Sequence, residues 1–248
     1  MMTFTIANKE LRALFGSPLA WIILAVLQVI LAYVFLGNVD GFLAIQPQLS
    51  TMANAPGITE IIVMPLFGSS AIFLLMAVPL MSMRMIAEER RNQTLTLLFS
   101  APVSMTEIAL GKFIGLIVFL GAIIGLIALM SLSLYLGGSI DLGLLAANVL
   151  GLILLAGAFA ALGLFISSLT DQPIIAAVGS LGVLILLWII NISAGDANSV
   201  MHYLSLLKHF ESFNRGMIDT TDLAYYILFI VLFLTLAIRR LDAERLRG

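Results

Sequence analysis

The chain has 248 residues, of which 61% are hydrophobic and only 10% are charged, and its formal net charge is −2. Soluble domains carry about 25% charged residues and about 45–50% apolar ones. This composition excludes an ordinary soluble protein, a disordered protein and a protein whose surface charge attracts nucleic acid. The sequence contains no cysteine, which excludes disulfides, thiol catalysis and cysteine-based metal sites. We therefore predict an all-α protein that crosses a membrane several times.

Six segments are apolar and long enough, or nearly so, to cross about 30 Å of hydrocarbon, which takes about 20 helical residues. They are residues 18–36, 61–82, 113–136, 143–167, 174–192 and 221–238. Prolines and glycines interrupt residues 37–60, which we expect to form an external loop. Pro65 and Pro79 predict a kink in the second span, because each proline removes a backbone donor.

Six crossings place both termini on the same side, and the basic residues indicate which side. With the N-terminus inside, only Lys208 and Arg215 of the 12 lysines and arginines face out. Because cytoplasmic segments carry the excess of basic residues, we predict that both termini are cytoplasmic. No charged residue lies well inside a span, where it costs at least ~2.5 kcal/mol. This pattern argues against a proton pump, a voltage sensor and an ion-coupled carrier.

Two segments that we expect on the cytoplasmic side, residues 1–17 and 84–106, are longer and more apolar than loops that only join membrane helices. Residues 1–17 mix apolar and charged side chains in a pattern that predicts an amphipathic helix in the membrane interface, with a solvated tail as the alternative. Its charged residues include Lys9, Glu10 and Arg12. Residues 84–106 begin with dense charge and continue with a cluster of leucines. Such leucines are typical of a docking element for a partner protein, and the alternative is that they sink into the lipid interface.

Residues 193–222 form an external segment in which apolar residues recur every three or four positions. The pattern predicts an amphipathic helix that lies at the outer membrane surface, followed by N-cap oxygens for the last span. The residues of interest in this segment are His209, Phe210, Phe213, Arg215, Asp219 and Asp222.

Small polar residues in or near the spans are candidates for lining a path across the membrane. These candidates are Ser69, Ser70, Ser131, Asn148 and Asn191. Hydrogen bonds between packed helices explain such residues equally well. His202 and His209 lie about 10.5 Å apart along a helix, too far for both to bind one metal ion, so we predict no metal site.

The sequence lacks the motifs of several large enzyme classes. It has no G-x-x-x-x-G-K-[ST] phosphate loop, no H-E-x-x-H and no G-x-S-x-G. We therefore predict no catalytic residue in this chain. If this protein moves a substrate against a gradient, another chain has to supply the energy.

In their order and spacing, several stretches resemble the ABC-2 type permeases, the six-helix membrane subunits of type-2 ABC exporters. The similarity lies in residues 87–91 (AEERR), Thr94, Leu97, Leu98, residues 101–103 (APV), Ile108, Gly111, Lys112 and residues 163–170 (GLFISSLT). The external segment is similar to that of the gliding-motility-type (Gld) branch. The chain departs from the family pattern at residues 93–96, where Gln-Thr-Leu-Thr replaces the usual Gly-Thr-x-Glu, and at Asp171, where asparagine is common.

The resemblance implies that residues 1–248 form a single transmembrane permease domain with residues 1–17 as its elbow helix. In the family, the segment after the second span contains the coupling helix, which docks onto a separate ABC ATPase subunit. Carried over to this chain, the ATPase contact consists of Glu88, Glu89, Arg90, Thr94, Leu97 and Leu98. ATP and Mg²⁺ are then bound by the ATPase, and this chain needs no cofactor.

The resemblance further implies a second permease copy or a paralogous permease, an auxiliary membrane protein with an extracytoplasmic domain, and a place in the bacterial inner membrane. The expected activity is ATP-driven export by alternating access. Two alternatives stay open. One is a mechanotransmitter that acts on an extracytoplasmic partner without moving a solute, and the other is an autonomous channel or carrier.

Overall fold

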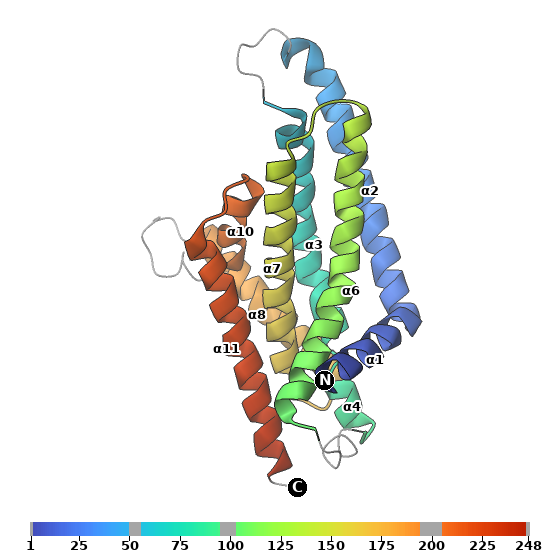
Figure 1. The fold of residues 1–248 in the computed structure, drawn as a ribbon, viewed down its shortest axis with the longest axis vertical. Coiled ribbons are helices and arrows are strands. Elements are labelled where there is room, and N and C mark those ends of the chain that lie inside the picture. Colours follow the sequence, from blue (N-terminus) through green and yellow to red (C-terminus); the bar gives the residue numbers. More distant parts are fainter. Residues whose placement is uncertain (1, 50–55, 95–102, 194–204, 247–248) are drawn as a thin grey trace.

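The computed structural model describes residues 2–49, 56–94, 103–193 and 205–246, which form an elongated helical bundle (Figure 1). In chain order the helices are α1 (Met2–Gly16), α2 (Pro18–Leu49), η1 (Thr59–Val63), α3 (Met64–Ser82), α4 (Ala87–Arg91), α6 (Met105–Ser133), η2 (Leu134–Leu136), α7 (Leu142–Ser167), α8 (Pro173–Ser193), α10 (Leu206–Asn214) and α11 (Thr220–Arg245). The N-terminus and the C-terminus lie at the same end of the bundle, together with α4 (Figure 1). We refer to this region as the charged end: α1, α4, residues 168–172 and residues 239–246.

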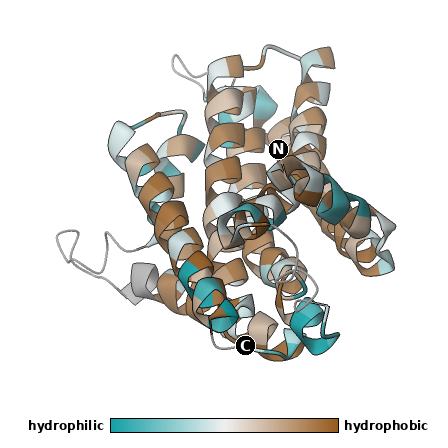
Figure 2. Cartoon of the chain, turned by 60° about the horizontal axis from the view of Figure 1, so that its bottom comes forward, coloured by the Kyte–Doolittle hydropathy of each residue, from teal (hydrophilic) through white to brown (hydrophobic). Residues whose placement is uncertain are grey.

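Five helical stretches of the described chain are long and apolar enough to cross a membrane. They are Pro18–Gln48, Thr59–Arg91, Met105–Leu136, Leu142–Ser167 and Thr220–Arg245. Helix α8 occupies the position of the remaining predicted span, but its apolar stretch, Pro173–Ile189, is shorter. Apolar residues dominate the helices, and hydrophilic residues gather near the C-terminus (Figure 2). The prediction of an all-helical protein that crosses the membrane several times is thus confirmed, with five long helices and one shorter one.

Helix α2 corrects the expected external loop. It continues through Gly37, Gly41 and Pro47 and ends at Leu49, so much of residues 37–60 is helical. Glycine costs only about 1 kcal/mol in a helix, and Pro47 lies in the last turn. With 32 residues the helix is about 48 Å long, which exceeds the thickness of the hydrocarbon layer.

The prolines of the second span lie near its ends. A π-helix, η1, precedes α3, and Pro65 falls in the first turn of α3, where its missing N–H is unneeded. Pro79 falls in the last turn of α3. Irregular backbone therefore adjoins both prolines: η1 ends at Val63, just before Pro65, and turns at residues 83–86 follow the last turn of α3. The kink itself stays a prediction.

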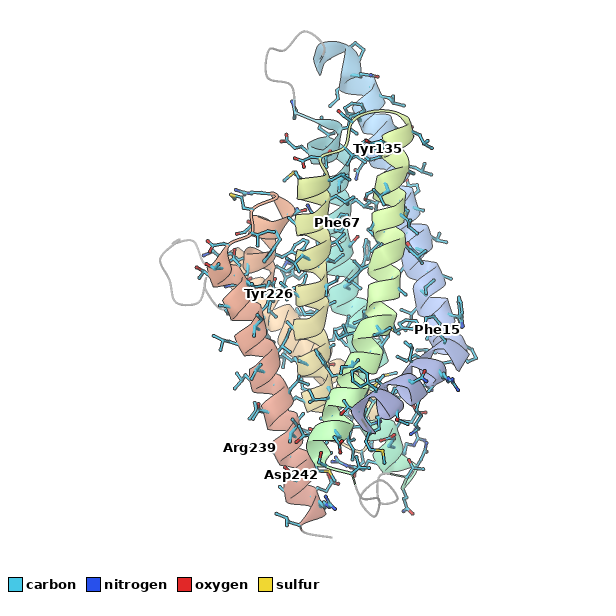
Figure 3. All side chains as sticks on the ribbon, viewed as in Figure 1. Phe15, Phe67, Tyr135, Tyr226, Arg239 and Asp242 are labelled. Atoms are coloured by element: carbon cyan, nitrogen blue, oxygen red, sulfur yellow. The ribbon has the colours of Figure 1, made fainter. Side chains whose placement is uncertain are left out.

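Helix α7 is the centre of the bundle, and small residues let its neighbours approach closely. The most apolar stretch of α7 is 67% buried inside the bundle, against 17% for α2 and 22% for α11. A Cβ added to Gly163 would lie 2.1 Å from Ser82 Oγ of α3. Phe67 and Tyr226 are fully buried in this core, whereas Phe15 and Tyr135 are exposed (Figure 3).

Candidate coupling interface

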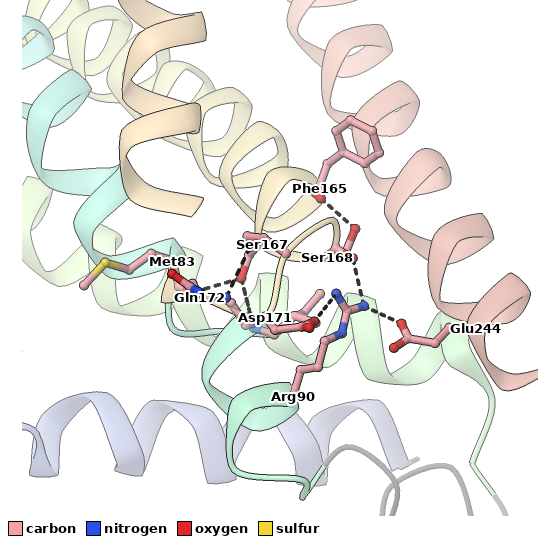
Figure 4. A network of polar contacts seen from close by, with 11 residues as sticks. Met83, Arg90, Phe165, Ser167, Ser168, Asp171, Gln172 and Glu244 are labelled. Atoms are coloured by element: carbon pink, nitrogen blue, oxygen red, sulfur yellow. Dashed lines mark hydrogen bonds and ion pairs between the residues drawn. The ribbon is translucent and has the colours of Figure 1, made fainter. Parts of the chain in front are cut away.

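Helix α4 lies at the centre of the charged end and is held by polar contacts. Of its five residues only Ala87 is buried, so polar contacts contribute much to its position, in addition to the buried Met85 and Ile86 that precede it. The amides of Ile86 and Ala87 donate to Ser167 Oγ, with donor–acceptor distances of 3.2 and 3.0 Å, and Ser167 Oγ donates to the Met83 carbonyl at 2.9 Å (Figure 4). A hydroxyl at the end of α7 thus replaces the side-chain cap that α4 lacks in its own sequence.

The C-terminus of α4 is closed by a Schellman motif. The amide of Thr94 donates to the Glu89 carbonyl, and the amide of Gln93 donates to the Arg90 carbonyl, both at 3.0 Å. Gln93 occupies the left-handed position of this motif with φ 56°. Glycine is favoured there because a Cβ is strained at positive φ. The glycine that the family pattern has at this position therefore matches the backbone, and Gln93 adopts a strained conformation.

One side of α4 is tied to α1 and α6 through a buried lysine. The Lys112 side chain of α6 is 1% exposed, and its Nζ lies 2.8 Å from Glu89 Oε1 and 2.9 Å from Glu10 Oε1. Lys9 of α1 approaches Glu89 at 3.6 Å and Glu10 at 3.9 Å. Because a buried charge needs partners, this cluster holds α4, α1 and α6 in one arrangement.

Two glycines of α6 make room for the cluster. Helix α1 crosses the lower part of α6 (Figure 1), and a Cβ on Gly111 would lie 2.7 Å from Ile6 Cβ. A Cβ on Gly115 would lie 2.9 Å from Glu10 Cβ. The G-x-x-x-G spacing places both glycines on one face of α6, so the two backbones approach closely. Larger residues would push α1 away and separate Glu10 from Lys112.

The other side of α4 is tied to the turn between α7 and α8 and to α11 through Arg90 (Figure 4). Its guanidinium lies 3.2 Å from the Asp171 carboxylate and donates to the Ser168 carbonyl at 2.9 Å, both in the turn between α7 and α8. It also pairs with Glu244 of α11. The Arg90 side chain is only 12% exposed and Glu244 is 31% exposed, so their pair is partly shielded from water, whereas Asp171 is 71% exposed and its pair with Arg90 is weakened by water.

A third contact joins α4 to the junction between α1 and α2. Arg84 donates to Ser17 Oγ at 3.2 Å and pairs with Glu88 at 2.9 Å. Both charged side chains are 39% exposed, so the pair contributes at most about 1 kcal/mol. Three consecutive residues of α4, Glu88, Glu89 and Arg90, thus connect to three different parts of the bundle.

Grooves flank α4 on both sides. One, of about 430 Å³, lies between α1, the start of α2 and α4. The ion-paired residues line it together with apolar side chains, among them Leu14, Leu19, Met81 and Met85. The other, of about 640 Å³, is lined by Arg90, Arg91 and the start of α8. Apolar surface beside charge is typical of a protein interface.

The structure brings most of the predicted contact residues together. Glu88, Glu89 and Arg90 lie side by side, with Lys9 and Glu10 paired to the same cluster. Thr94 lines the first groove, and its hydroxyl donates to the Glu89 carbonyl at 3.2 Å. Arg12 is exposed on α1. Leu97 and Leu98 lie outside the described residues, so their part in the contact stays a prediction.

Four residues complete this arrangement without having been assigned to it from the sequence: Lys112, Ser167, Asp171 and Glu244. A lysine between two glycines at the start of an apolar run is the signal that identifies Lys112. Glu244 is 154 positions from Arg90, and no local pattern relates the two.

The segment that contains α10 packs against the helical bundle. Helix α10 is amphipathic, as expected, but His209 belongs to its buried face, together with Leu206, Phe210 and Phe213. His209 Nδ1 lies 2.5 Å from Asp222 Oδ1 of α11, and this pairing compensates the imidazole for the loss of water. Because α10 packs on α3, α7, α8 and α11, it is part of the bundle. Its place at the outer membrane surface stays a prediction.

The predicted N-cap of the last span is confirmed for Asp219. Its Oδ1 accepts a hydrogen bond from the Thr221 amide at 2.9 Å. The hydrogen bonds from Thr221 hold the pKa of this carboxyl below its usual range. Asp222, in contrast, pairs with His209. Arg215 is exposed and lies 4.0 Å from Glu211.

Among the candidate path residues, Ser70, Ser131 and Asn148 are fully buried, and Ser69 is half-buried. The two buried serines donate to carbonyls one turn earlier in their own helices. Asn148 Nδ2 donates to the Asn214 carbonyl at 3.2 Å, which joins α7 to the end of α10. The side chain of Asn191 lies outside what the structure describes. None of the four described residues lines either groove beside α4, and the part of all five in a path stays a prediction.

Within the described ranges, no three His, Asp or Glu side chains gather as a metal site requires. His202, considered above for metal binding, lies outside these ranges.

The fold and the charged end define a class: a helical multi-pass membrane protein whose charged end is organised around one short helix. A family model described as "ABC-2 family transporter protein" matches residues 4–246. The chain therefore belongs to the ABC-2 transporter family, as the resemblance predicted. Members are membrane transport components that normally work with an ABC ATPase. A search of curated proteins found no match.

Proposed function

We propose that this chain is the permease subunit of an ATP-driven ABC-2 type transporter, in which a separate ATPase subunit supplies the energy for export. The position of α4 carries the proposal. This short helix forms the end of the second long stretch, Thr59–Arg91, and is connected to α1 and α6 on one side and to the turn between α7 and α8 and to α11 on the other. A force applied to α4 therefore reaches both sides of the bundle.

We assign the ATPase contact to the exposed parts of α4 and to the residues that follow it, Thr94, Leu97 and Leu98. Glu88 is 39% exposed and is available to a partner. Glu89 and Arg90 are only 16% and 12% exposed, and their pairing within the chain supports a role in transmitting movement. ATP and Mg²⁺ bind to the ATPase in this scheme, and this chain contributes no catalytic residue.

The transport cycle then follows from the links around α4. ATP-driven closure of two ATPase subunits moves α4 and, with it, the helices to which it is paired. The bundle alternates between inward-open and outward-open states because the two states bind the nucleotide-loaded ATPase with different affinity. Neutral spans rich in small residues fit lipids, polysaccharides, peptides and small hydrophobic molecules alike.

The assembly includes a second copy of the chain or a paralogous permease, because six helices make half of a type-2 exporter. We place the charged end in the cytoplasm, on the distribution of basic residues, and the whole complex in the bacterial inner membrane. The likeness of the external segment to the Gld branch supports an auxiliary membrane protein with an extracytoplasmic domain as a further partner.

One observation favours mechanotransmission as a second candidate function. Helix α11 carries Glu244, paired with Arg90, at one end and Asp222, paired with His209 of α10, at the other. A single helix thus connects α4 to the external segment. In this version the ATPase moves α11 and α10 and so acts on an extracytoplasmic partner without passage of a solute.

Affinity purification in mild detergent tests the proposal. A tagged copy of the chain is isolated, and the co-purifying proteins are identified by mass spectrometry. An ABC ATPase in stoichiometric amount supports the permease function. An ATPase together with an extracytoplasmic companion, but no ATP-dependent flux in reconstituted vesicles, favours mechanotransmission. Isolation of the chain alone, with flux from the purified chain, would contradict both and favour an autonomous channel or carrier.

A further inference from the structure

Helices α1 and α4 are separated by a groove of about 430 Å³, so side-chain packing does not fill the space between them. Their described ionic contacts run through two lysines. The Lys9 side chain is 63% exposed, and water weakens its contacts at 3.6 and 3.9 Å. Lys112 is 1% exposed and contacts one carboxylate from each helix at hydrogen-bond distance. The buried contact is therefore the stronger connection between α1 and α4.

The surroundings of Lys112 contain few other charges. Glu10, Glu89 and Lys9 complete the cluster, whose formal charge is zero. Glu89 Oε2 is buried without a hydrogen-bond partner, so Glu89 is held through its other oxygen. If the ammonium were removed, the Glu89 carboxylate would keep, among the ion pairs of the described residues, the one with the exposed Lys9.

Stability by itself does not explain a lysine at this position. Replacing a buried ion-paired cluster with apolar residues of similar volume is often neutral or stabilising, whereas ionic pairing specifies one geometry. A methionine at position 112 beside neutral residues at positions 10 and 89 would pack similarly, but it would leave α1 and α4 without a directional contact.

We propose that Lys112 is a positioning residue that makes the elbow helix α1 move together with α4. Its ammonium, held between Glu10 and Glu89, transmits displacement of α4 to α1 and to the first turns of α6. The inference rests on the proposed function in one respect, namely that the ATPase displaces α4. The ionic connection itself is a property of this chain and is testable without the ATPase.

The natural chain has no cysteine, so a pair of introduced cysteines is unique. Spin labels are attached to Asn8→Cys on α1 and Arg91→Cys on α4, both of which replace exposed residues. Their separation is measured by pulsed electron paramagnetic resonance, for the chain alone and for the ATPase complex with and without a non-hydrolysable ATP analogue. The test background is the triple variant Glu10→Gln, Glu89→Gln, Lys112→Met.

With the native cluster, we expect one narrow distribution of the distance between the two spin labels. Nucleotide binding should not shift this distribution, because α1 and α4 move as a unit. The triple variant is expected to give a broader distribution in the chain alone and a shift to longer distance when nucleotide binds the complex. Glu211→Gln, which removes an exposed carboxylate on α10, should behave like the native chain.

An unchanged narrow distribution in the triple variant, with and without nucleotide, would overturn the inference. Thermal unfolding checks that the triple variant folds, and Glu89→Gln alone provides a milder variant that keeps the Lys112–Glu10 pair. If no ATPase associates with the chain, the proposed function fails, but the distribution in the isolated chain still decides whether Lys112 links the two helices.

Discussion

Ser167 shows how one side chain organises the charged end. It is fully buried, accepts hydrogen bonds from two amides at the start of α4 and donates to the Met83 carbonyl. These bonds provide the N-terminal cap of a helix that belongs to a different part of the chain. The position of α4 therefore depends on the end of α7 as much as on its own residues.

Ser167→Ala is expected to destabilise the protein by about 1–3 kcal/mol, because two buried amides lose their acceptor. Thermal unfolding in detergent measures the effect as a lower midpoint. Ser133→Ala is the matched control, since Ser133 is exposed and donates only to the Met130 carbonyl in its own turn. Equal midpoints for the two variants would contradict the capping role.

Gln93, in contrast to Ser167, matters through its backbone conformation. Because it holds φ 56° at the end of α4, Gln93→Gly should relieve about 1 kcal/mol of strain. The expected result is a higher unfolding midpoint. Asn92→Gly, at φ −84° in the same turn, is the control and should not stabilise. A lower midpoint for the Gln93 variant would show that its side-chain contacts outweigh the strain.

At the scale of helices, glycines decide which pairs approach closely. Gly151 on α7 faces α10, where an added Cβ would lie 2.4 Å from Phe213 Cβ. Gly111 and Gly115 on α6 face α1 in the same way. Gly121, farther along α6, has no atom within 4 Å of an added Cβ. Glycines of one helix thus differ in role according to what lies opposite.

Gly151→Ala should destabilise the protein by about 1–3 kcal/mol, because the new methyl group pushes α10 away from α7. Hydrogen exchange at the amides of α10 should rise as the contact loosens. Gly121→Ala provides the comparison and should be neutral or stabilising, since alanine favours a helix by about 1 kcal/mol. If both variants lost the same stability, the close α7–α10 contact would not be the cause.

For the whole molecule, the links at α4 determine how it would respond to a partner. Glu89 pairs with Lys112 of α6, whereas Arg90 pairs with Glu244 of α11. At its other end α11 pairs with α10 through Asp222 and His209. A partner that binds near α4 therefore acts on the bundle through ionic contacts, which are directional, in addition to apolar packing.

Leu98→Glu should abolish association with the ATPase and leave membrane insertion intact, because a charge replaces an apolar contact residue at the interface. Co-purification yield measures the association. Leu246→Glu is the matched control, because Leu246 is 88% exposed at the charged end. Recovery of the ATPase at wild-type yield with Leu98→Glu would show that the coupling assignment is wrong.

The sequence by itself determined the membrane class, the apolar segments of the long helices, though not the full length of α2, and the Asp219 cap. These features are local: a span needs about 20 apolar residues wherever it lies, and a cap contacts amides two or three positions away. It also located the segment that contains α4, through the concentration of charge after the second span.

Only the tertiary structure decided the partners of those charges. Arg90 pairs with Asp171 and Glu244, and Lys112 joins Glu10 to Glu89, across separations that follow from helix packing. His209 is buried for the same reason, because Asp222 of α11 lies opposite it. Periodicity identifies a polar residue on a helix, but whether that residue faces water or a counter-charge depends on which helix packs against it.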